Sequence, residues 1–521
     1  MTKLIAMLSI AGIAGAQAPS APSDPHPGER AVIVDVLVRN KTGPVSGLTK
    51  DDFTLQDKGK PQTIAIFAPT EARDPSAKPS PLSPLVGNNK VTRQGLPIQA
   101  ATVVLYDRLN TPAADQAFVR KQVLAALSKL PETATFAFYS LGRSLAVVHD
   151  FTEDPASLIH AAERLSAAPP QPPPANPADQ TMQKALEDAL QPEQGIDMLF
   201  RVATTTRAFQ SITRHLAGLP GRKSIAWITR TFPLTFGADV NRREELVKEL
   251  NAFTETLLDE DVALYSLNPG GVGKGYKDNT TSNTDQAQVQ EGQLLTGANA
   301  SIAQDSGTLS DNSTMEDVAH TTGGLAFYNL NEIASKVNDV IADGDLTYSL
   351  GFYPTKLDGK AHDFGVKVKA SGATLRFRKK YLAAKEDLRL QTPPIPQLAA
   401  DPLEATAIAL VAAAQPDPAH PGSQKVDVSV NLNDLTLQHA ADRWTGTFEM
   451  GLSINGTMGA TGAVKVYKLN LTDDQFHQAQ RSGLIVSNTI DTGNQPVYLR
   501  AIVRDNTSGS AGAVHVPLPS K

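Results

Sequence analysis

The middle of the chain alternates between two hydrophobic patterns, and this alternation constrains the fold more than any other feature. A continuous apolar run over residues 102–106 ends in Asp107, and helical spacing follows over residues 114–130. Further strand-like and helical stretches succeed one another as far as residue 345. Buried strands separated by helices favour a largely parallel sheet that is covered on both faces. We therefore predict an α/β domain over residues 99–345, with a doubly wound, mostly parallel sheet.

Two segments inside this domain break the pattern. Residues 167–200 contain a dense run of prolines, which neither a helix interior nor an inner strand tolerates. Residues 269–314 are rich in Gly, Asn, Thr, Ser and Gln and have few apolar positions. Both segments are therefore predicted to be long loops.

The flanking regions show period-two alternation, which is typical of half-buried strands. We predict β-rich, Ig-like modules on both sides of the α/β domain, and expect the helical spacing of residues 403–411 to form a helix on the last of them. The predicted divisions are a signal peptide (1–18), a small β-module (29–68), a Pro-rich linker (69–98), the α/β domain (99–345), a β extension packing with the first module (346–382) and a β-sandwich (403–518).

The N-terminal residues have the three parts of an export signal. Lys3 provides the positive charge, residues 4–15 are apolar, and Ala16-Gln17-Ala18 fits a cleavage site. The apolar run is shorter than the roughly 20 residues that span a membrane, and no comparable run follows. We expect a secreted or periplasmic protein without a transmembrane segment after cleavage.

Composition excludes several kinds of chemistry. The chain has 521 residues, a net charge of −6 and no cysteine. The absence of cysteine rules out disulfides, thiolate metal sites and cysteine nucleophiles. The mild negative charge argues against a nucleic-acid partner on electrostatic grounds.

The most informative candidate site lies where the first strand of the α/β domain ends. Ligands of open α/β sheets bind beyond the carboxyl ends of the strands. Asp107, Asn110 and Thr111 follow that strand and are our candidate ligand-binding residues. Their oxygens can face a hard cation such as Mg²⁺. Alternatively, Asp107 and Asn110 are hydrogen-bonding loop residues that cap and orient the following helix.

Several short motifs occur in one order along residues 29–382, and the region resembles a von Willebrand factor type A domain. More narrowly, it is similar to the VWFA-related family abundant in Acidobacteria. The motifs are Gly47-Leu48-Thr49 with Asp52-Phe53, Gly59-Lys60-Pro61-Gln62, Asp107 with Leu109-Asn110-Thr111-Pro112, Leu141-Gly142-Arg143, Gly221-Arg222-Lys223, Gly323-Gly324 and the run from Tyr348 to Pro354.

The resemblance implies a metal-ion-dependent adhesion site built on Asp-x-Ser-x-Ser, with a Thr on a second loop and an Asp on a third. Asp107 and Thr111 match the first and last positions, so they are the candidate metal ligands. Leu109 replaces the first Ser, and Arg230 stands where the third-loop Asp is expected. The second-loop Thr is one of three adjacent candidates: Thr204, Thr205 and Thr206. We therefore expect a degenerate metal site and no cofactor, with Mg²⁺ as the alternative.

These features favour a non-enzymatic binding or adhesion-type protein whose partner is a protein or a cell-surface component. No Gly-x-Ser-x-Gly, His-Glu-x-x-His or EF-hand pattern is present. His149 and Asp150 are adjacent on a predicted strand, so they point to opposite faces. The alternatives are a structural scaffold of an envelope complex and an exported hydrolase that uses the carboxylates of Asp107, Asp150 and Glu153.

Overall fold

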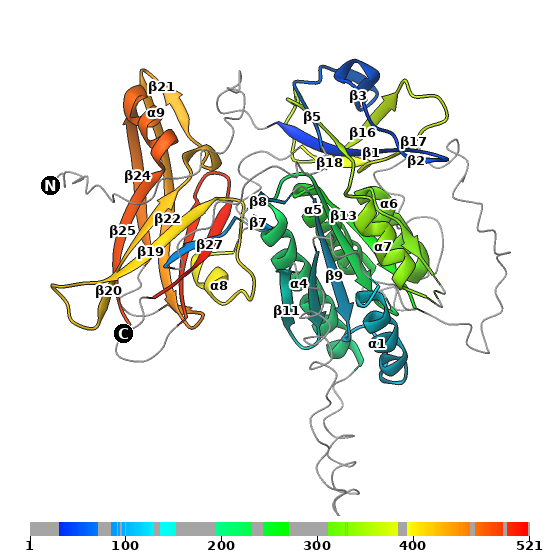
Figure 1. Cartoon of the computed structure of the whole chain (residues 1–521), viewed down its shortest axis with the longest axis horizontal. Coiled ribbons are helices and arrows are strands. Elements are labelled where there is room, and N and C mark those ends of the chain that lie inside the picture. Colours follow the sequence, from blue (N-terminus) through cyan, green and yellow to red (C-terminus); the bar gives the residue numbers. More distant parts are fainter. Residues whose placement is uncertain are drawn as a thin grey trace, which may run out of the picture.

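The computed structural model places three parts side by side: a β-rich module, an α/β domain and a β-sandwich (Figure 1). It describes residues 31–70, 85–90, 92–93, 96–98, 100–129, 136–152, 194–231, 243–269, 311–328, 330, 332–383, 393–458, 464–492 and 498–518. The expected signal peptide and most of the two expected loops, 167–200 and 269–314, lie outside these residues.

A six-stranded sheet forms the centre of the α/β domain. Its order is β11-β10-β9-β12-β13-β14, so the strands run third, second, first, fourth, fifth, sixth along the chain. Neighbours pair in parallel except β10 and β11, which are antiparallel. This order confirms the doubly wound, mostly parallel sheet. The strands are β9 (Ala100–Asp107), β10 (Phe136–Leu141), β11 (Leu145–Thr152), β12 (Arg222–Ile228), β13 (Val262–Leu267) and β14 (Ala326–Phe327).

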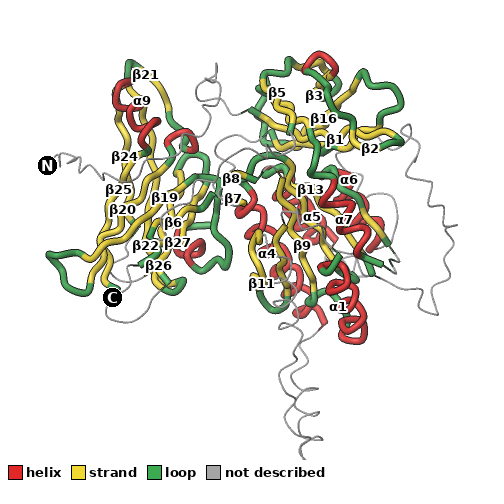
Figure 2. Tube along the Cα trace, viewed as in Figure 1, coloured by secondary structure: helices red, strands yellow, loops and turns green. Residues whose placement is uncertain are grey.

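Helices cover both faces of this sheet (Figure 2). One buried cluster joins α1 (Ala113–Leu127) and α7 (Ala334–Ala342) to the first face. A second cluster joins the other face to α4 (Gln194–Leu216), α5 (Arg243–Asp259) and α6 (Asp311–Thr322). Both expected loops are too long at their C-terminal ends: α4 begins at Gln194, inside 167–200, and α6 begins at Asp311, inside 269–314. The polar first turn of α6 conceals the apolar spacing that follows.

The β-rich module is assembled from both sides of the α/β domain. Strand β1 (Val32–Asn40) pairs antiparallel with β15 (Tyr348–Phe352), more than 310 residues later in the sequence. The α/β domain is therefore inserted between two halves of one module. The other elements are β2 (Gly43–Pro44), η1 (Lys50–Asp52), β3 (Phe53–Asp57), β4 (Lys60–Gln62), β5 (Ile66–Pro69), β16 (Ala361–Val368), β17 (Thr374–Arg376) and β18 (Lys380–Leu382).

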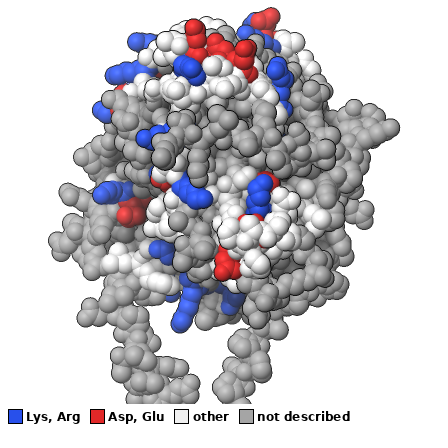
Figure 3. All heavy atoms as spheres, turned by 90° about the vertical axis from the view of Figure 1, so that its left-hand side faces the viewer, with Lys and Arg blue, Asp and Glu red and all other residues white. Residues whose placement is uncertain are grey.

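Two packed antiparallel sheets form the C-terminal β-sandwich around one apolar cluster. On the side that it turns outward, basic and acidic side chains lie interspersed among uncharged ones (Figure 3). Its elements are α8 (Ile395–Ala399), β19 (Leu410–Pro416), β20 (Ser423–Val430), η4 (Leu432–Asp434), β21 (Gln438–Ala440), β22 (Arg443–Ile454), β23 (Thr457–Met458), β24 (Lys465–Thr472), α9 (Asp473–Ser482), β25 (Leu484–Asp491), β26 (Leu499–Asp505) and β27 (Ala511–Val516).

The expected Pro-rich linker, 69–98, is partly structured. Strand β6 (Val86–Asn88) pairs with β19 and belongs to the sandwich, and β7 (Thr92–Arg93) pairs with β8 (Leu96–Pro97). Asn89 is buried, and its amide donates to the carbonyls of Ala405 and Ile408 at 3.0 and 2.8 Å. The linker is therefore anchored to the sandwich before the chain enters the α/β domain.

The helix expected over 403–411 is absent. The described backbone is irregular there until Leu410 begins β19, although Leu403, Ala405 and Ile408 are buried. These apolar residues pack against two different domains, and this explains a helix-like spacing without a helix. Within the described ranges, none of the helices combines the length and the apolar character needed to span a membrane.

Candidate functional site

Asp107 is the last residue of β9, at the carboxyl edge of the sheet. Its neighbours on the loop, Arg108 and Leu109, donate their backbone N–H groups to the carbonyl of Leu141 at the end of β10. The side chain of Asp107 is completely buried. The expected site thus forms at the predicted edge, but below the protein surface.

Hydrogen bonds from protein N–H groups hold the Asp107 carboxylate. Oδ1 accepts from the backbone N of Asn110 at 2.9 Å. Oδ2 accepts from Nδ2 of Asn110 at 2.7 Å and from Nε1 of Trp227 at 3.0 Å. Burial raises the pKa of Asp107 to about 6, although these hydrogen bonds favour the ionised form and oppose the rise.

The other two candidate residues extend this network. Nδ2 of Asn110 also donates to Oγ1 of Thr205 at 2.9 Å. Of the three candidate threonines on α4, Thr205 is therefore the one that joins this hydrogen-bond network. Oγ1 of Thr111 donates to the main-chain carbonyl of Asp107 at 2.6 Å. Like Asp107, Asn110 and Thr111 are buried. We call these four residues together with Trp227 the Asp107 centre.

Arg230 lies beside this centre, on the loop after β12. Its Nε donates to Oδ2 of Asp115 at 2.9 Å, and its Nη1 donates to Oδ1 of Asn268 at 3.0 Å. The guanidinium thus links the loops after β12 and β13 to the start of α1. Thr231, the next residue, donates from both N and Oγ1 to the carbonyl of Asn110.

The residues of the Asp107 centre do not fit a magnesium ion. A hard cation needs several oxygen ligands with free lone pairs. The Asp107 oxygens instead receive N–H groups, Leu109 has no ligand atom and packs against the core, and Arg230 places a positive charge nearby. Among the described residues, no cluster of three or more His, Asp or Glu side chains is arranged to hold a metal.

The alternative prediction is right in one part: Asp107 and Asn110 hydrogen-bond to each other on the loop, but neither is the N-cap of the following helix. Pro112 is the N-cap of α1, and no side chain caps that helix. Asp107 and Asn110 instead tie the end of β9 to the middle of α4 and to the end of β12. Sequence reasoning missed Trp227, because an apolar-looking residue inside a strand gives no sign that its indole N–H meets a carboxylate.

The exposed surface around the Asp107 centre differs from the buried centre. Arg108 and Arg143 are exposed on the neighbouring loops after β9 and β10. Leu199 and Phe200, in the first turns of α4, are 43% and 46% exposed. We call these four residues the carboxyl-edge surface. The β-rich module lies at the opposite, amino-terminal ends of the strands (Figure 1).

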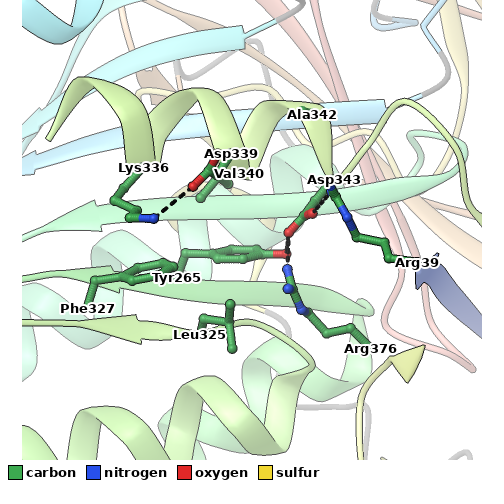
Figure 4. A pocket seen from close by; sticks show the side chains of 10 residues that line it. All are labelled: Arg39, Tyr265, Leu325, Phe327, Lys336, Asp339, Val340, Ala342, Asp343 and Arg376. Atoms are coloured by element: carbon green, nitrogen blue, oxygen red, sulfur yellow. Dashed lines mark hydrogen bonds and ion pairs between the residues drawn. The ribbon is translucent and has the colours of Figure 1, made fainter. Parts of the chain in front are cut away.

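A pocket of about 280 Å³ lies at that opposite end, where the module meets the α/β domain. Figure 4 shows Asp343 between Arg39 and Arg376, with the Tyr265 ring crossing the pocket toward it. Tyr265 donates to Oδ2 of Asp343 at 2.7 Å, and Arg39 reaches Oδ1 at 2.9 Å. The charges in this pocket already pair with one another, so we assign it a structural role as a joint.

His149 and Asp150 are both on β11, and Asp150 joins a cluster with Tyr139 and His215. Its Oδ1 accepts from the Tyr139 hydroxyl at 2.6 Å and lies 3.2 Å from Nε2 of His215. Glu153, the third carboxylate of the hydrolase alternative, lies outside the described residues. Asp107 is on a different strand and is enclosed in its own network, so no described contact joins it to Asp150.

No protein-family model and no curated protein matches the sequence. Structural similarity is found to an aerotolerance-related membrane protein from Bacteroides fragilis, with 11% identity, 47% of this chain and 98% of that chain covered, and a TM-score of 0.23. BatB from Bacteroides thetaiotaomicron has 15% identity, 47% and 97% coverage, and a TM-score of 0.23. A von Willebrand factor type A protein from Catenulispora acidiphila has 10% identity, 65% and 78% coverage, and a TM-score of 0.26. At these values the assignment of the fold rests on the strand order of the sheet.

Proposed function

We propose that the chain is an exported, non-enzymatic binding protein of the VWFA-related type, and that its α/β domain binds a protein partner without a metal ion. The observation that carries the proposal is the carboxyl-edge surface. Ligands of doubly wound sheets bind at this edge, and neither described β-rich part covers it. Secretion or a periplasmic location belongs to the same proposal and is supported by the sequence of residues 1–18.

The carboxyl-edge surface suggests the chemistry of the partner. Arg108 and Arg143 offer two exposed guanidinium groups on a protein of net negative charge. Leu199 and Phe200 add exposed apolar area on the same edge. Arginine and aromatic side chains dominate binding energy in many protein interfaces. A partner that presents carboxylates beside apolar side chains fits this surface.

The Asp107 centre supports metal-independent binding. Its hydrogen bonds make it a rigid support beneath the loop that carries Arg108, because they join three elements of the domain. A preorganised loop lowers the entropy that binding must overcome. The centre therefore keeps the loop that carries Arg108 in one conformation. Its own residues are buried and act without contacting the partner.

Calorimetric titration of the mature protein with Mg²⁺ and Mn²⁺ tests the metal-independent part of this proposal. We expect no binding heat. A heat that disappears in Asp107→Asn but persists in Asp115→Asn shows a working metal site and overturns the proposal.

Affinity capture from envelope extracts tests the binding surface. We expect one reproducible partner that is retained in EDTA and is lost in Arg108→Glu/Arg143→Glu and in Phe200→Ser. Lys121→Glu, an exposed residue of α1, is the matched control and should retain the partner. A partner that binds all four proteins equally places the interaction elsewhere on the molecule.

A further inference from the structure

The segment 401–408 joins the α/β domain to the sandwich and contacts both. Toward the α/β domain, Nη2 of Arg214 reaches Oδ2 of Asp401 at 2.8 Å, and the backbone N of Thr406 donates to the carbonyl of Arg214 at 3.2 Å. Toward the sandwich, Ala513 N donates to the carbonyl of Ala405 at 2.8 Å. We call this set of contacts the sandwich joint.

The two surfaces approach each other closely at this joint. Gly218 N donates to Oγ1 of Thr406 at 2.9 Å, and that hydroxyl donates to the carbonyl of His215 at 2.7 Å. A Cβ at Gly218 would lie 1.8 Å from the carbonyl oxygen of Thr406. The joint is therefore a defined contact and depends on the exact position of the end of α4.

His215 is buried at the centre of this joint, between two acceptors. Its Nδ1 lies 2.6 Å from the main-chain carbonyl of Glu404, and its Nε2 lies 3.2 Å from Oδ1 of Asp150. Phe151 stacks on the imidazole with ring centroids 5.6 Å apart and fixes its plane. Nε2 makes no aligned hydrogen bond and meets the Asp150 carboxylate at ion-pair distance. A neutral imidazole has one N–H and so can serve only one of the two oxygen groups, whereas the imidazolium presents an N–H to each.

We propose that His215 is a proton-dependent latch: its imidazolium attracts both the Asp150 carboxylate within the α/β domain and the Glu404 carbonyl on the segment that leads into the sandwich. After loss of the proton the carboxylate, the stronger acceptor, competes for the single remaining N–H, so the contact with Glu404 across the joint weakens. This latch is independent of what the carboxyl-edge surface binds. It gives the protein a way to loosen the contact between its α/β domain and its sandwich as the surrounding pH rises.

The charged groups around His215 decide the direction of the effect. Burial opposes the imidazolium, but the Asp150 carboxylate and the Glu404 carbonyl outweigh it and raise the pKa of His215. Burial also opposes the Asp150 carboxylate, yet the charge of His215 and the Tyr139 hydroxyl lower the pKa of Asp150. Because Asp150 is half exposed, its interaction with His215 is partly screened by solvent.

Other titratable groups face the joint from the neighbouring elements. The carboxylate of Glu404 accepts from the backbone N of His515 on β27, and burial raises its pKa. Arg214 is paired with Asp401. Arg500 on β26 donates to the carbonyl of Asp401 at 2.5 Å, and His149 lies next to Asp150 on β11. Among these, His215 is the histidine whose ring hydrogen-bonds across the joint and whose pKa is raised.

The sign of the pH effect follows from the raised pKa. The protonated contact is fully present below the unfolded pKa of about 6.5 and is lost as pH rises through the higher folded pKa. The joint should therefore weaken as pH rises above about 6.5. Backbone hydrogen exchange of Thr406, whose N–H crosses the joint, reports this directly.

Hydrogen exchange of the full mature chain, corrected for intrinsic rates, is the test. We expect protection of the Thr406 amide to fall by at least about threefold between pH 6 and pH 9. Protection of the Lys379 amide, which donates to Thr321 at 2.8 Å at the other end of the domain, should stay constant. Equal changes at Thr406 and Lys379 overturn the latch.

Variants separate His215 from other titrating groups. His215→Gln should make Thr406 protection independent of pH, and His420→Gln, a 71% exposed histidine side chain of the sandwich, should keep the wild-type response. Persistence of the response in His215→Gln overturns the proposal. A direct NMR titration of His215 in the wild-type chain avoids dependence on variant folding: we expect a midpoint above 6.5, lowered in Asp150→Asn, and a wild-type midpoint below 6.5 contradicts the latch.

Discussion

The α/β domain meets the other two parts of the molecule through joints of different chemistry. At the module joint, Arg39 and Arg376 hold the buried Asp343, and Arg378 donates to the main-chain carbonyls of Ile33 and Leu258. At the sandwich joint, His215 bridges Asp150 and the carbonyl of Glu404. Arginine remains protonated wherever proteins fold, whereas histidine changes its charge near neutral pH. The first joint is therefore built to be permanent, and the second can respond to pH.

Removal of Asp343 should have the largest effect and tests whether the module joint depends on its charges. Asp343→Ala leaves two guanidinium groups and the Tyr265 hydroxyl without their acceptor. We expect a loss of about 3 kcal/mol in the free energy of unfolding, because three donors lose one buried acceptor while solvent screens part of the cost at the two partly exposed guanidinium groups. Trp227 fluorescence during denaturant unfolding, in a Trp444→Phe background, reports the α/β domain alone.

Asp339 provides the matched control for Asp343. Asp339 lies in α7, the helix whose C-cap is Asp343. It pairs with Lys336 at 3.0 Å, but its side chain is 60% exposed. Asp339→Ala should change the free energy of unfolding by less than about 0.5 kcal/mol. Equal losses in the two variants would show that the module joint does not depend on the buried carboxylate.

The titration of Asp107 should have the next largest effect on stability. This effect falls at more acid pH than the effect of His215, so the two can be measured separately. The folded pKa of Asp107, about 6, lies above its ordinary value of 3.8, so protonation favours the folded state. This contribution is fully present below about pH 4 and is lost as pH rises through 6, a span of about 3 kcal/mol. Denaturant midpoints measured from pH 4 to pH 7 should show this term in the wild type.

Asp107→Asn provides the comparison for that measurement. The variant should be less stable at neutral pH, because an amide N–H₂ replaces one acceptor of the Asn110 and Trp227 donors. Its stability should also lack the wild-type slope between about pH 4 and pH 6. A variant that retains the full slope assigns the acid-range titration to another group.

Asn89 tests how firmly the linker is held to the sandwich near its joint. Asn89→Ala removes two hydrogen bonds to the carbonyls of Ala405 and Ile408 and one from the backbone N of Leu410. We expect a loss of about 2 kcal/mol, which is roughly a thirtyfold fall in protection of the Leu410 amide. Asn88→Ala, on the neighbouring residue, should leave that amide nearly unchanged, and an equal fall would show that Asn89 is not the anchor.

The smallest effect should come from an ion pair that belongs to neither joint. Lys129 and Glu332 pair on the surface, and their side chains are 57% and 56% exposed. Lys129→Ala should change stability by less than about 0.5 kcal/mol, because solvent and salt screen exposed pairs. Thermal unfolding at low and high salt measures this small stability change, which serves as the reference for the variants at the two joints. A loss above about 1 kcal/mol would show that an ion pair stabilises this protein without being buried, so burial would not explain the larger effects expected at the joints.

Local patterning was sufficient to predict the α/β domain. The run 102–106 and the spacing of residues 114–130 gave β9 and α1 because period and burial are properties of consecutive residues. The same reasoning placed Asp107 at a carboxyl edge, since a buried parallel strand must end there. Helix α6 was missed because its first turn, from Asp311, is polar and resembles a loop.

The pairing of distant segments was beyond local patterning. Strand β6 joins the sandwich although its surroundings are rich in proline, because its partner β19 lies more than 320 residues further along the chain. The role of Asp107 was likewise decided by Trp227 and Thr205, which reach it from other elements. His215 carried no signal, since a histidine near the end of a helix does not show which acceptors surround it.

The sequence by itself determined the periodic elements and their order, since both follow from the alternation of apolar and polar residues. The tertiary structure alone decided that Asp107 is enclosed by N–H donors and that His215 lies between two acceptors. A side chain's charge depends on the groups around it in space. Those groups come from segments that the sequence holds far apart, so the two joints and the Asp107 centre exist only in the folded chain.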